Sequence, residues 1–246
     1  MALAAGSFID EYMIPLLAGN RPACREIVRR HTVTVPDPVT AFHELLWPAM
    51  ERVEKLYRAD RINLASEHMA TRINRAIADQ LQTQLPRSAS NGKRVLIICA
   101  DGEPEELGAQ MCSDLLEAEG WDVYFLGGGV PNDEIMSLSG QLRPDILLVF
   151  GTQPTGVPGV RRLIDMIRGV GLNPTMNIIV SGGVFNRTEG LWKEVNADHY
   201  AKNASELLKM AGTLTPRVPS DRPVSTIKKR RRRRRADAPV AVGAGA

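Results

Sequence analysis

The period of the hydrophobic pattern changes near residue 90, and this change constrains the fold more than any other feature of the sequence. Between residues 8 and 85, apolar residues recur every three or four positions, as they do on the buried face of a helix. From residue 94 onward, short apolar runs alternate with helix-like segments, which is typical of a parallel sheet with helical crossovers. The sequence therefore predicts a helical bundle followed by an α/β domain.

The helical part contains four segments with this pattern, at about residues 8–17, 22–30, 39–58 and 62–85. In the third segment Phe42, Leu46, Met50 and Val53 lie at intervals of three and four, so they form one apolar stripe. Pro48 lies within this stripe and predicts a kink, because proline has no backbone N–H to donate. Short connections between the segments indicate a four-helix bundle over residues 1–86.

The second part, residues 93–213, is predicted to be a flavodoxin-like, doubly wound, five-stranded parallel sheet covered by helices. The expected strands are residues 94–99, 123–126, 146–150, 178–181 and 199–201. The expected helices are residues 105–119, 132–142, 157–170, 191–195 and 204–213. Residues 86–93, PRSASNGK, are small and polar, and they indicate a linker between the two parts.

Basic charge is concentrated in a C-terminal tail, residues 214–246, which we expect to be disordered. The run KKRRRRRR from Lys228 to Arg235 supplies eight positive charges, so a chain of net charge +3 carries −5 over its other residues. This balance argues against a nucleic-acid-binding domain in the folded body. The tail alone offers attraction to nucleic acid or to an acidic partner, and its alternative is a solvated charge block.

Cysteine usage and hydropathy indicate the compartment. The three cysteines, Cys24, Cys99 and Cys112, have no spacing typical of a disulfide framework or a zinc site. The sequence has no apolar run of the roughly 20 residues that a membrane span needs, and no pattern typical of a signal peptide. We therefore expect a cytoplasmic protein without a membrane span.

Glycine is abundant where the predicted strands end. The loops that follow the first four strands are residues 100–108, 127–131, 151–156 and 182–184, and three of them are glycine-rich. In an open parallel sheet, ligands bind beyond the carboxyl ends of the strands, and glycine allows the backbone to approach a ligand closely. These loops are the expected ligand site, although turn geometry alone also explains glycine in such loops.

The spacing of particular residues in these loops resembles that of cobalamin-binding domains. That family has an acidic residue, a histidine two positions later and a glycine three positions after that, then a Ser-x-Leu and a Gly-Gly further along the chain. Here Glu103-x-Glu105-x-x-Gly108 precedes Phe150-Gly151-Thr152 by the family's interval of 41 residues, and Gly182-Gly183 follows. The resemblance implies cofactor contacts for Glu105, Gly108, Phe150, Thr152, Gly182 and Gly183.

The helical half resembles the cap of CarH-type light-sensing regulators. That cap has a tryptophan, nine residues and then Glu-His, and its tryptophan lies against the upper face of the corrin. Here Tyr57 is followed by nine residues and then by Glu67-His68. The resemblance implies that Tyr57, Glu67 and His68 face a tetrapyrrole, with His68 as the candidate metal ligand. The alternative is an ordinary packed tyrosine and a helix histidine that faces solvent.

Two departures from the family bear on the ligand. Glu105 stands where the family has its lower cobalt ligand, a histidine, and a carboxylate suits cobalt less well than an imidazole. Phe150 stands where the family has the serine that helps to place the nucleotide tail. The choice of ligand is left open between three tetrapyrroles: cobalamin (adenosylcobalamin) with its own base on the cobalt, haem, and a bilin. Cys99 is a candidate thiol for tethering a bilin, and otherwise a small buried side chain.

The resemblance implies a tetrapyrrole-binding sensory or photoreceptor-type regulator without a DNA-binding domain of its own, similar to AerR-type antirepressors. Its partner would be a transcription regulator, and a homo-oligomer is open. The alternatives are a pigment protein with a bilin or haem, a corrinoid methyl-carrier subunit of a methyltransferase system, and a scaffold without ligand. We do not expect an enzyme, because the loops hold no nucleophile with a neighbouring base.

Overall fold

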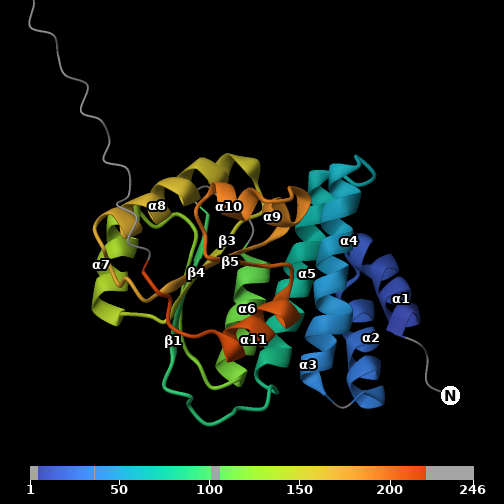
Figure 1. Ribbon diagram of the computed structural model, residues 1–246. Coiled ribbons are helices and arrows are strands. Elements are labelled where there is room, and N and C mark those ends of the chain that lie inside the picture. Colours follow the sequence, from blue (N-terminus) through green and yellow to red (C-terminus); the bar gives the residue numbers. More distant parts are fainter. Residues whose placement is uncertain (1–4, 36, 101–105, 220–246) are drawn as a thin grey trace, which may run out of the picture.

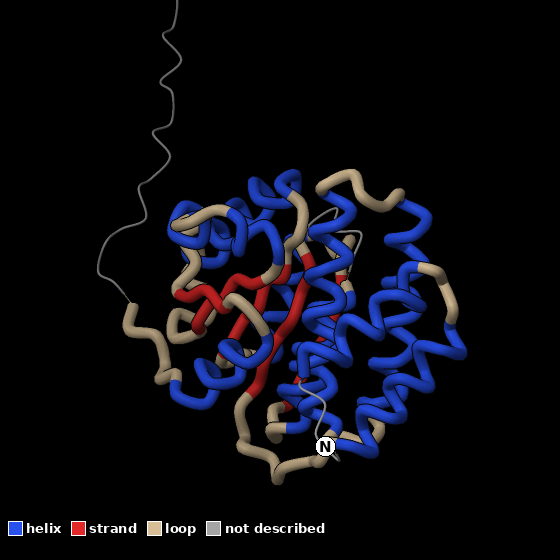
Figure 2. The backbone as a smooth tube through the Cα atoms, turned by 90° about the vertical axis from the view of Figure 1, so that its right-hand side faces the viewer, coloured by secondary structure: helices blue, strands red, loops and turns tan. Residues whose placement is uncertain are grey.

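The computed structural model describes residues 5–35, 37–100 and 106–219. Glu103, Glu105 and the basic run from Lys228 to Arg235 lie outside these residues, so the predictions made for them stay predictions. The described chain forms a helical bundle beside a sheet with helices on both of its faces (Figures 1 and 2). This arrangement confirms the predicted fold class.

The bundle consists of α1 (Ala5–Leu17), α2 (Arg21–Thr34), α3 (Pro38–Ala41), η1 (Phe42–Leu46), α4 (Trp47–Arg58) and α5 (Leu64–Gln82). Side chains cap the helices where the sequence offers them: Asn20 accepts from the backbone N–H of Ala23, and Asn63 from that of Ser66. Inside the bundle, the buried Tyr12 hydroxyl donates to Asn74 Oδ1 at 2.8 Å. This bond ties α1 to α5, which forms one side of the site described below.

The predicted kink at Pro48 takes a different form. The segment expected to be one kinked helix is α3, the π-helical turn η1 and α4 in direct succession. A π-helical turn adds one residue to the hydrogen-bonded ring, and such turns are among the identifiable causes of helix distortion. Pro48 is the second residue of α4, where a missing N–H costs little. The distortion expected at Pro48 therefore lies just before it, in the π-helical turn η1.

The α/β domain has the five predicted strands, β1 (Arg94–Cys99), β2 (Asp122–Gly127), β3 (Ile146–Phe150), β4 (Asn177–Ser181) and β5 (His199–Ala201). All neighbouring pairs are parallel, and the order β2-β1-β3-β4-β5 is the flavodoxin-like order that was predicted. The connecting helices are α6 (Leu107–Ala118), α7 (Asn132–Leu142), α8 (Val157–Gly169), α9 (Gly183–Arg187), α10 (Leu191–Glu194) and α11 (Ala204–Thr213), with the short 3-10 turn η2 (Pro154–Gly156) before α8.

The two faces of the sheet have different neighbours. One face packs against α7 and α8 in a core that includes Leu147, Val149 and Ile164. The other face packs against α6 and α11, and its core continues without a break into the bundle through α5. The bundle and the α/β domain therefore share a core, and α4 and α5 lie beside the end of the sheet where the strands finish (Figure 1).

The sequence missed one helix. Residues 182–184 were expected to be a glycine loop, but Gly183 begins α9, and only Gly182 (φ +101°) has a backbone that favours glycine. Helix α9 supplies two residues of the site. Separately, none of the helices in the described ranges is both long enough and apolar enough to cross a membrane.

Candidate functional site

A cleft of about 440 Å³ lies between the bundle and the carboxyl ends of the strands. Its lining comes from α4 and α5 on one side and from the loops after β3 and β4, with Gly108 of α6, on the other. Most of the predicted site residues line it: Tyr57, Glu67, His68, Gly108, Phe150, Thr152, Gly182 and Gly183. The structure therefore brings together residues from both halves of the sequence.

The side of the cleft that the bundle forms is called here the upper wall, and it consists of Met50, Tyr57, Leu64 and His68. Met50 and Tyr57 share a face of α4 because they lie two turns apart, and Leu64 and His68 share a face of α5 because they lie one turn apart. The side chain of Tyr57 is 37% exposed and that of Leu64 is 51% exposed. The bundle thus presents apolar and aromatic surface to the cleft, together with the imidazole of His68 and the charged side chains of Glu51, Glu54, Arg58 and Glu67.

Among the predicted site residues that the structure describes, His68 has the most exposed polar side chain. Its side chain is 61% exposed, and its Nε2 lies 3.6 Å from Glu67 Oε2. Glu67 is turned inward, where its Oε1 accepts from the Thr71 hydroxyl at 3.3 Å. Of the four histidines in the sequence, at positions 31, 43, 68 and 199, only His68 lines the cleft. It is therefore the one imidazole that a ligand in the cleft can meet.

The opposite side of the cleft, called here the floor, consists of Gly108, Phe150, Thr152, Gly182 and Gly183. Phe150 is 2% exposed, and its ring covers Gly108 so closely that a Cβ on that glycine would overlap the ring. The indole of Trp47 meets the Phe150 ring edge to face, with 6.4 Å between ring centroids. The aromatic pair therefore joins the first turn of α4 to the end of β3.

A second contact between the halves crosses the floor at α9. The Arg187 guanidinium donates to Glu54 Oε1 of α4 and to the backbone carbonyl of Thr152. A Cβ on Gly183 would lie within 2.9 Å of both Glu54 carboxylate oxygens and of the Arg187 guanidinium. The ion pair thus lies directly over this glycine.

Other polar groups near the floor are bonded within the protein. Asn186 lines the cleft, yet its amide N–H donates to the Lys202 carbonyl at 3.0 Å and its Oδ1 accepts from the Tyr200 hydroxyl at 2.6 Å. Burial, with the carboxylates of Glu206 and Glu51, raises the pKa of Tyr200 above its usual value, so this hydroxyl stays a donor. The floor therefore offers few unused polar groups.

Cys99 requires a correction, because it does not line the cleft. It is the last residue of β1, it is buried, and it pairs with Phe150 in the sheet. Because this thiol is buried and does not line the cleft, the structure does not support Cys99 as the tether for a bilin. Within the described ranges, no three His, Cys, Asp or Glu side chains are grouped to hold a metal ion.

Sequence reasoning missed three residues that shape the cleft: Trp47, Glu54 and Arg187. Glu54 lies about one turn before Tyr57 on α4, and Trp47 lies about three turns before it, so helical spacing from Tyr57 was a usable signal. Arg187 offered no such signal. It acts through a partner 133 positions away, and its own segment did not have the pattern of a helix.

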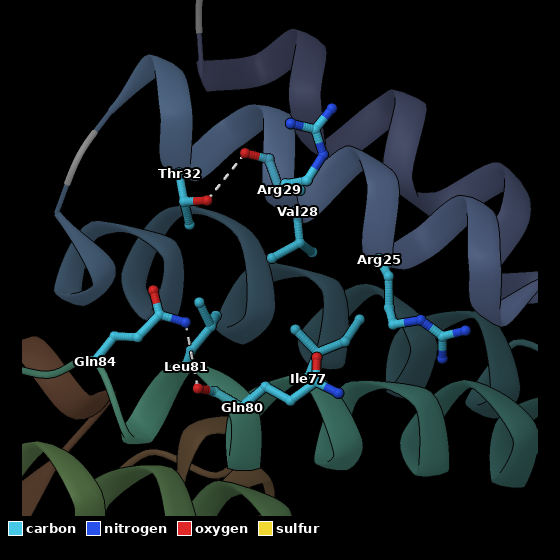
Figure 3. Close-up of a pocket in the computed structure, with 8 residues that line it drawn as sticks. All are labelled: Arg25, Val28, Arg29, Thr32, Ile77, Gln80, Leu81 and Gln84. Atoms are coloured by element: carbon cyan, nitrogen blue, oxygen red, sulfur yellow. Dashed lines mark hydrogen bonds between the residues drawn. The ribbon is translucent and has the colours of Figure 1, made fainter.

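A second hollow, of about 350 Å³, lies between α2 and α5 and shares no residue with the cleft (Figure 3). Three of its polar side chains are bonded locally: the Arg29 guanidinium to Glu26, the Thr32 hydroxyl to the Arg29 carbonyl, and the Gln84 amide to the Gln80 carbonyl. It receives nothing from the loops of the sheet. The cleft is therefore the candidate site.

Two family models match the chain, one over each of its two halves. A family model described as a B12 binding domain matches residues 93–209, and a second model with the same description matches residues 9–82. The first range covers the α/β domain and the second covers the bundle.

Similar proteins and structures agree with these matches. Dimethylamine corrinoid protein 1 of Methanosarcina acetivorans is 24% identical over 180 residues, which are 72% of this chain and 84% of that protein. Monomethylamine corrinoid protein 1 of the same organism is 21% identical over 216 residues, 85% of this chain and 98% of that protein. The structure of the Methanosarcina barkeri monomethylamine corrinoid protein superposes with a TM-score of 0.76 at 18% identity, over 85% of this chain and 98% of that one, and so shares the fold.

Proposed function

The chain belongs to the B12-binding domain family, and we propose that it is a corrinoid carrier, a protein that holds a corrin ring in the cleft and presents it to a partner enzyme. The single observation that carries the proposal is the cleft itself. An exposed tyrosine and an exposed histidine from the bundle face the glycine loops of the sheet across about 440 Å³.

The residues present suit the body of a corrin ring, which is flat, apolar on its faces and polar at its edge. Met50, Tyr57 and Leu64 offer apolar contact to one face, and burying such exposed side chains stabilises a complex by about 25 cal/mol per Å² of apolar surface. His68 offers the imidazole, a good ligand for cobalt. When bound, the corrinoid supplies a cobalt centre that can accept and release a methyl group.

The relatives favour a carrier over the sensory regulator that the cap motif suggested. The names of the reported proteins refer to methylamines and a corrinoid, and none refers to light or transcription. In a carrier the chemistry belongs to the partner, so we propose that this chain is not an enzyme by itself. The proposed partner is a methyltransferase in place of the transcription regulator, and the ligand is a corrinoid in place of a bilin or haem.

Binding is tested by titrating the purified full chain with hydroxocobalamin and following the absorbance of the corrinoid. Tyr57→Ala and His68→Ala should each weaken binding about fivefold or more, since each removes a contact of about 1 kcal/mol. Tyr124 is the matched control, because it is also 37% exposed but lies on β2 away from the cleft. Unchanged affinity in both cleft variants, or absence of binding to the wild type, would contradict the proposal.

Carriage and light sensing are separated by illumination. The complex with adenosylcobalamin is passed over a size-exclusion column before and after exposure to green light. A carrier keeps the same oligomeric state in both runs. A change in elution volume after light that is absent in the dark control would favour the sensory regulator over the carrier.

A further inference from the structure

We infer that the cleft binds a corrinoid by its ring alone, and that the nucleotide tail of a complete cobalamin stays outside the α/β domain. The ligand class is therefore corrinoids whose nucleotide is absent, or whose base remains on the cobalt. This inference rests on the proposed function and extends it to the choice among corrinoids.

The argument begins with the shape of the ligand. Cobalamin carries a side chain that ends in a planar aromatic base, and this base either coordinates the cobalt or leaves it. A base that leaves the cobalt and enters the protein needs a slot one aromatic ring thick, with carbon contacts of about 3.5–4 Å on both faces. Such a slot must open from the floor, because the floor is where the α/β domain meets the cleft.

Aromatic packing closes the floor at the end of β3. The ring of Phe150 fills the space over Gly108, to the point that one added carbon on this glycine would overlap it. The ring is 2% exposed and is held by Trp47 from the bundle. A second aromatic group cannot enter between Phe150 and Gly108 without expelling a buried side chain, and losing a packed phenylalanine from a core is strongly unfavourable.

Backbone contact and charge close the floor at the end of β4. A Cβ on Gly182 would overlap the carbonyl oxygen of Gly151, so these two loops already touch. The ion pair of Glu54 and Arg187 covers Gly183 from above. The glycines of this loop line the cleft, but their contacts leave no slot one aromatic ring thick between the ends of β3 and β4.

The end of β2 is closed by a carboxylate. Glu106 Oε1 accepts from the backbone N–H of Gly128 at 2.6 Å, and its carboxyl group lies against Gly127, where a Cβ would be 2.5 Å from Oε1. At the ends of β2, β3 and β4, where the structure describes the loops that follow, the space is thus filled by the protein's own groups.

The histidines point to the same conclusion. A protein that takes the base off the cobalt commonly replaces it with another nitrogen ligand, since imidazole suits cobalt. The loops of the floor contain no histidine in the sequence, and His68 belongs to the opposite wall. Nothing on the floor therefore compensates for removing the base.

The test compares two ligands on the unmodified full chain: hydroxocobalamin, which carries the nucleotide, and aquohydroxocobinamide, which lacks it. We expect dissociation constants within about threefold of each other and a base-on spectrum for bound cobalamin. Binding of cobalamin more than about tenfold tighter than cobinamide, or conversion to the base-off spectrum, would overturn the inference while supporting the proposed function. Absence of binding by either ligand would overturn both.

A pair of variants sharpens the test. Phe150→Ser opens the space over Gly108, so cobalamin should gain about tenfold or more over cobinamide and shift toward the base-off spectrum. Ile164→Ser is the control, because Ile164 is fully buried on α8 in the core on the other face of the sheet and does not line the cleft, and the ratio should stay at the wild-type value. An unchanged ratio in Phe150→Ser refutes the closing role of Phe150. If the variants do not fold, the wild-type ratio decides.

Discussion

On the upper wall of the cleft, Tyr57, Leu64 and His68 keep 37% to 61% of their surface exposed, whereas on the floor Phe150 is 2% exposed and the glycines lie against other protein groups. Both walls were singled out by the same kind of sequence motif. Within the described residues, the Tyr57 hydroxyl has no hydrogen-bond partner, while both polar atoms of Asn186 on the other side are bonded.

Residues that belong to one ligand motif can therefore have two different physical roles, binding and stabilisation of the fold. Exposed groups add nothing to folding and are free to bind, so the upper wall should matter for affinity. Buried and mutually packed groups stabilise the fold, so the floor should matter for stability. If this division holds, substitutions on the floor should lower the free energy of unfolding much more than substitutions on the upper wall.

The largest change is expected at the contact between Phe150 and Gly108. Phe150→Ala should lower the free energy of unfolding by about 3–5 kcal/mol, and Gly108→Ala by about 1–3 kcal/mol through overpacking. The double variant should lose less than the sum, because removing the ring relieves the overlap, with a coupling of about 1–2 kcal/mol. Urea unfolding measures all three. Strict additivity would show that Gly108 is not held by Phe150.

A smaller loss is expected for Gly182→Ala, at about 2–3 kcal/mol, because its φ of +101° strains any side chain and its Cβ would overlap the backbone of Gly151. Gly190→Ala is the control, with φ +78° and open space around its Cβ, and should lose only about 1 kcal/mol. Equal midpoints in urea for the two variants would mean that the loops on the floor do not touch.

Below the floor, Asp114 of α6 should make stability depend on pH. Burial, with the charges of Asp79 and Glu117, raises its pKa to about 7, and its Oδ2 has no hydrogen-bond partner among the described residues. The folded state thus holds the proton more tightly than the unfolded state, so the stabilisation is complete below pH about 4 and is lost as the pH rises to about 7.

Asp114→Asn should remove this dependence and raise the free energy of unfolding at pH 8 by about 1 kcal/mol or more, or roughly 2–4 °C in Tm. Thermal unfolding at pH 5 and pH 8 measures it. The exposed Asp165, which pairs with Arg161, supplies the control Asp165→Asn, whose Tm should keep the wild-type dependence. A variant of Asp114 that is less stable than wild type at pH 8 contradicts the assignment.

The smallest change is expected on the upper wall. Tyr57→Ala should alter the free energy of unfolding by no more than about 0.5 kcal/mol, although the proposed function requires that it weaken corrinoid binding. Tyr12→Ala provides the contrast, since it removes a buried ring and its bond to Asn74 and should cost about 3–5 kcal/mol. A large loss of unfolding free energy in Tyr57→Ala would show that the upper wall also stabilises the fold, which would contradict the difference between the two walls.

The sequence predicts the strands well because each is a short apolar run, and the predicted and observed bounds of β1, β3 and β5 are the same. It does not predict the turn η1 or helix α9, whose formation depends on tertiary packing around Pro48 and Gly183. The contacts that close the floor are also out of reach. Trp47 and Phe150 are 103 positions apart and Glu54 and Arg187 are 133 positions apart, and neither pair has a local pattern.

The same limit applies to function. The spacing of Tyr57 and Glu67-His68 correctly gathers these residues at the cleft, but it describes how a cap is placed over a ring, which a carrier and a light sensor share. The names of the similar proteins favour the proposed carrier, a preference that the motif does not give. The motif identified residues that line one cleft.

Hydrogen exchange of the full chain, measured with and without hydroxocobalamin, tests most directly whether the ring lies between the two walls. We expect slower exchange in α4 and the first two turns of α5, together with residues 150–153 and 182–187. Exchange around Gln80 and Gln84, in the hollow between α2 and α5, should be unchanged. Protection confined to one wall, or located in that hollow, would contradict it.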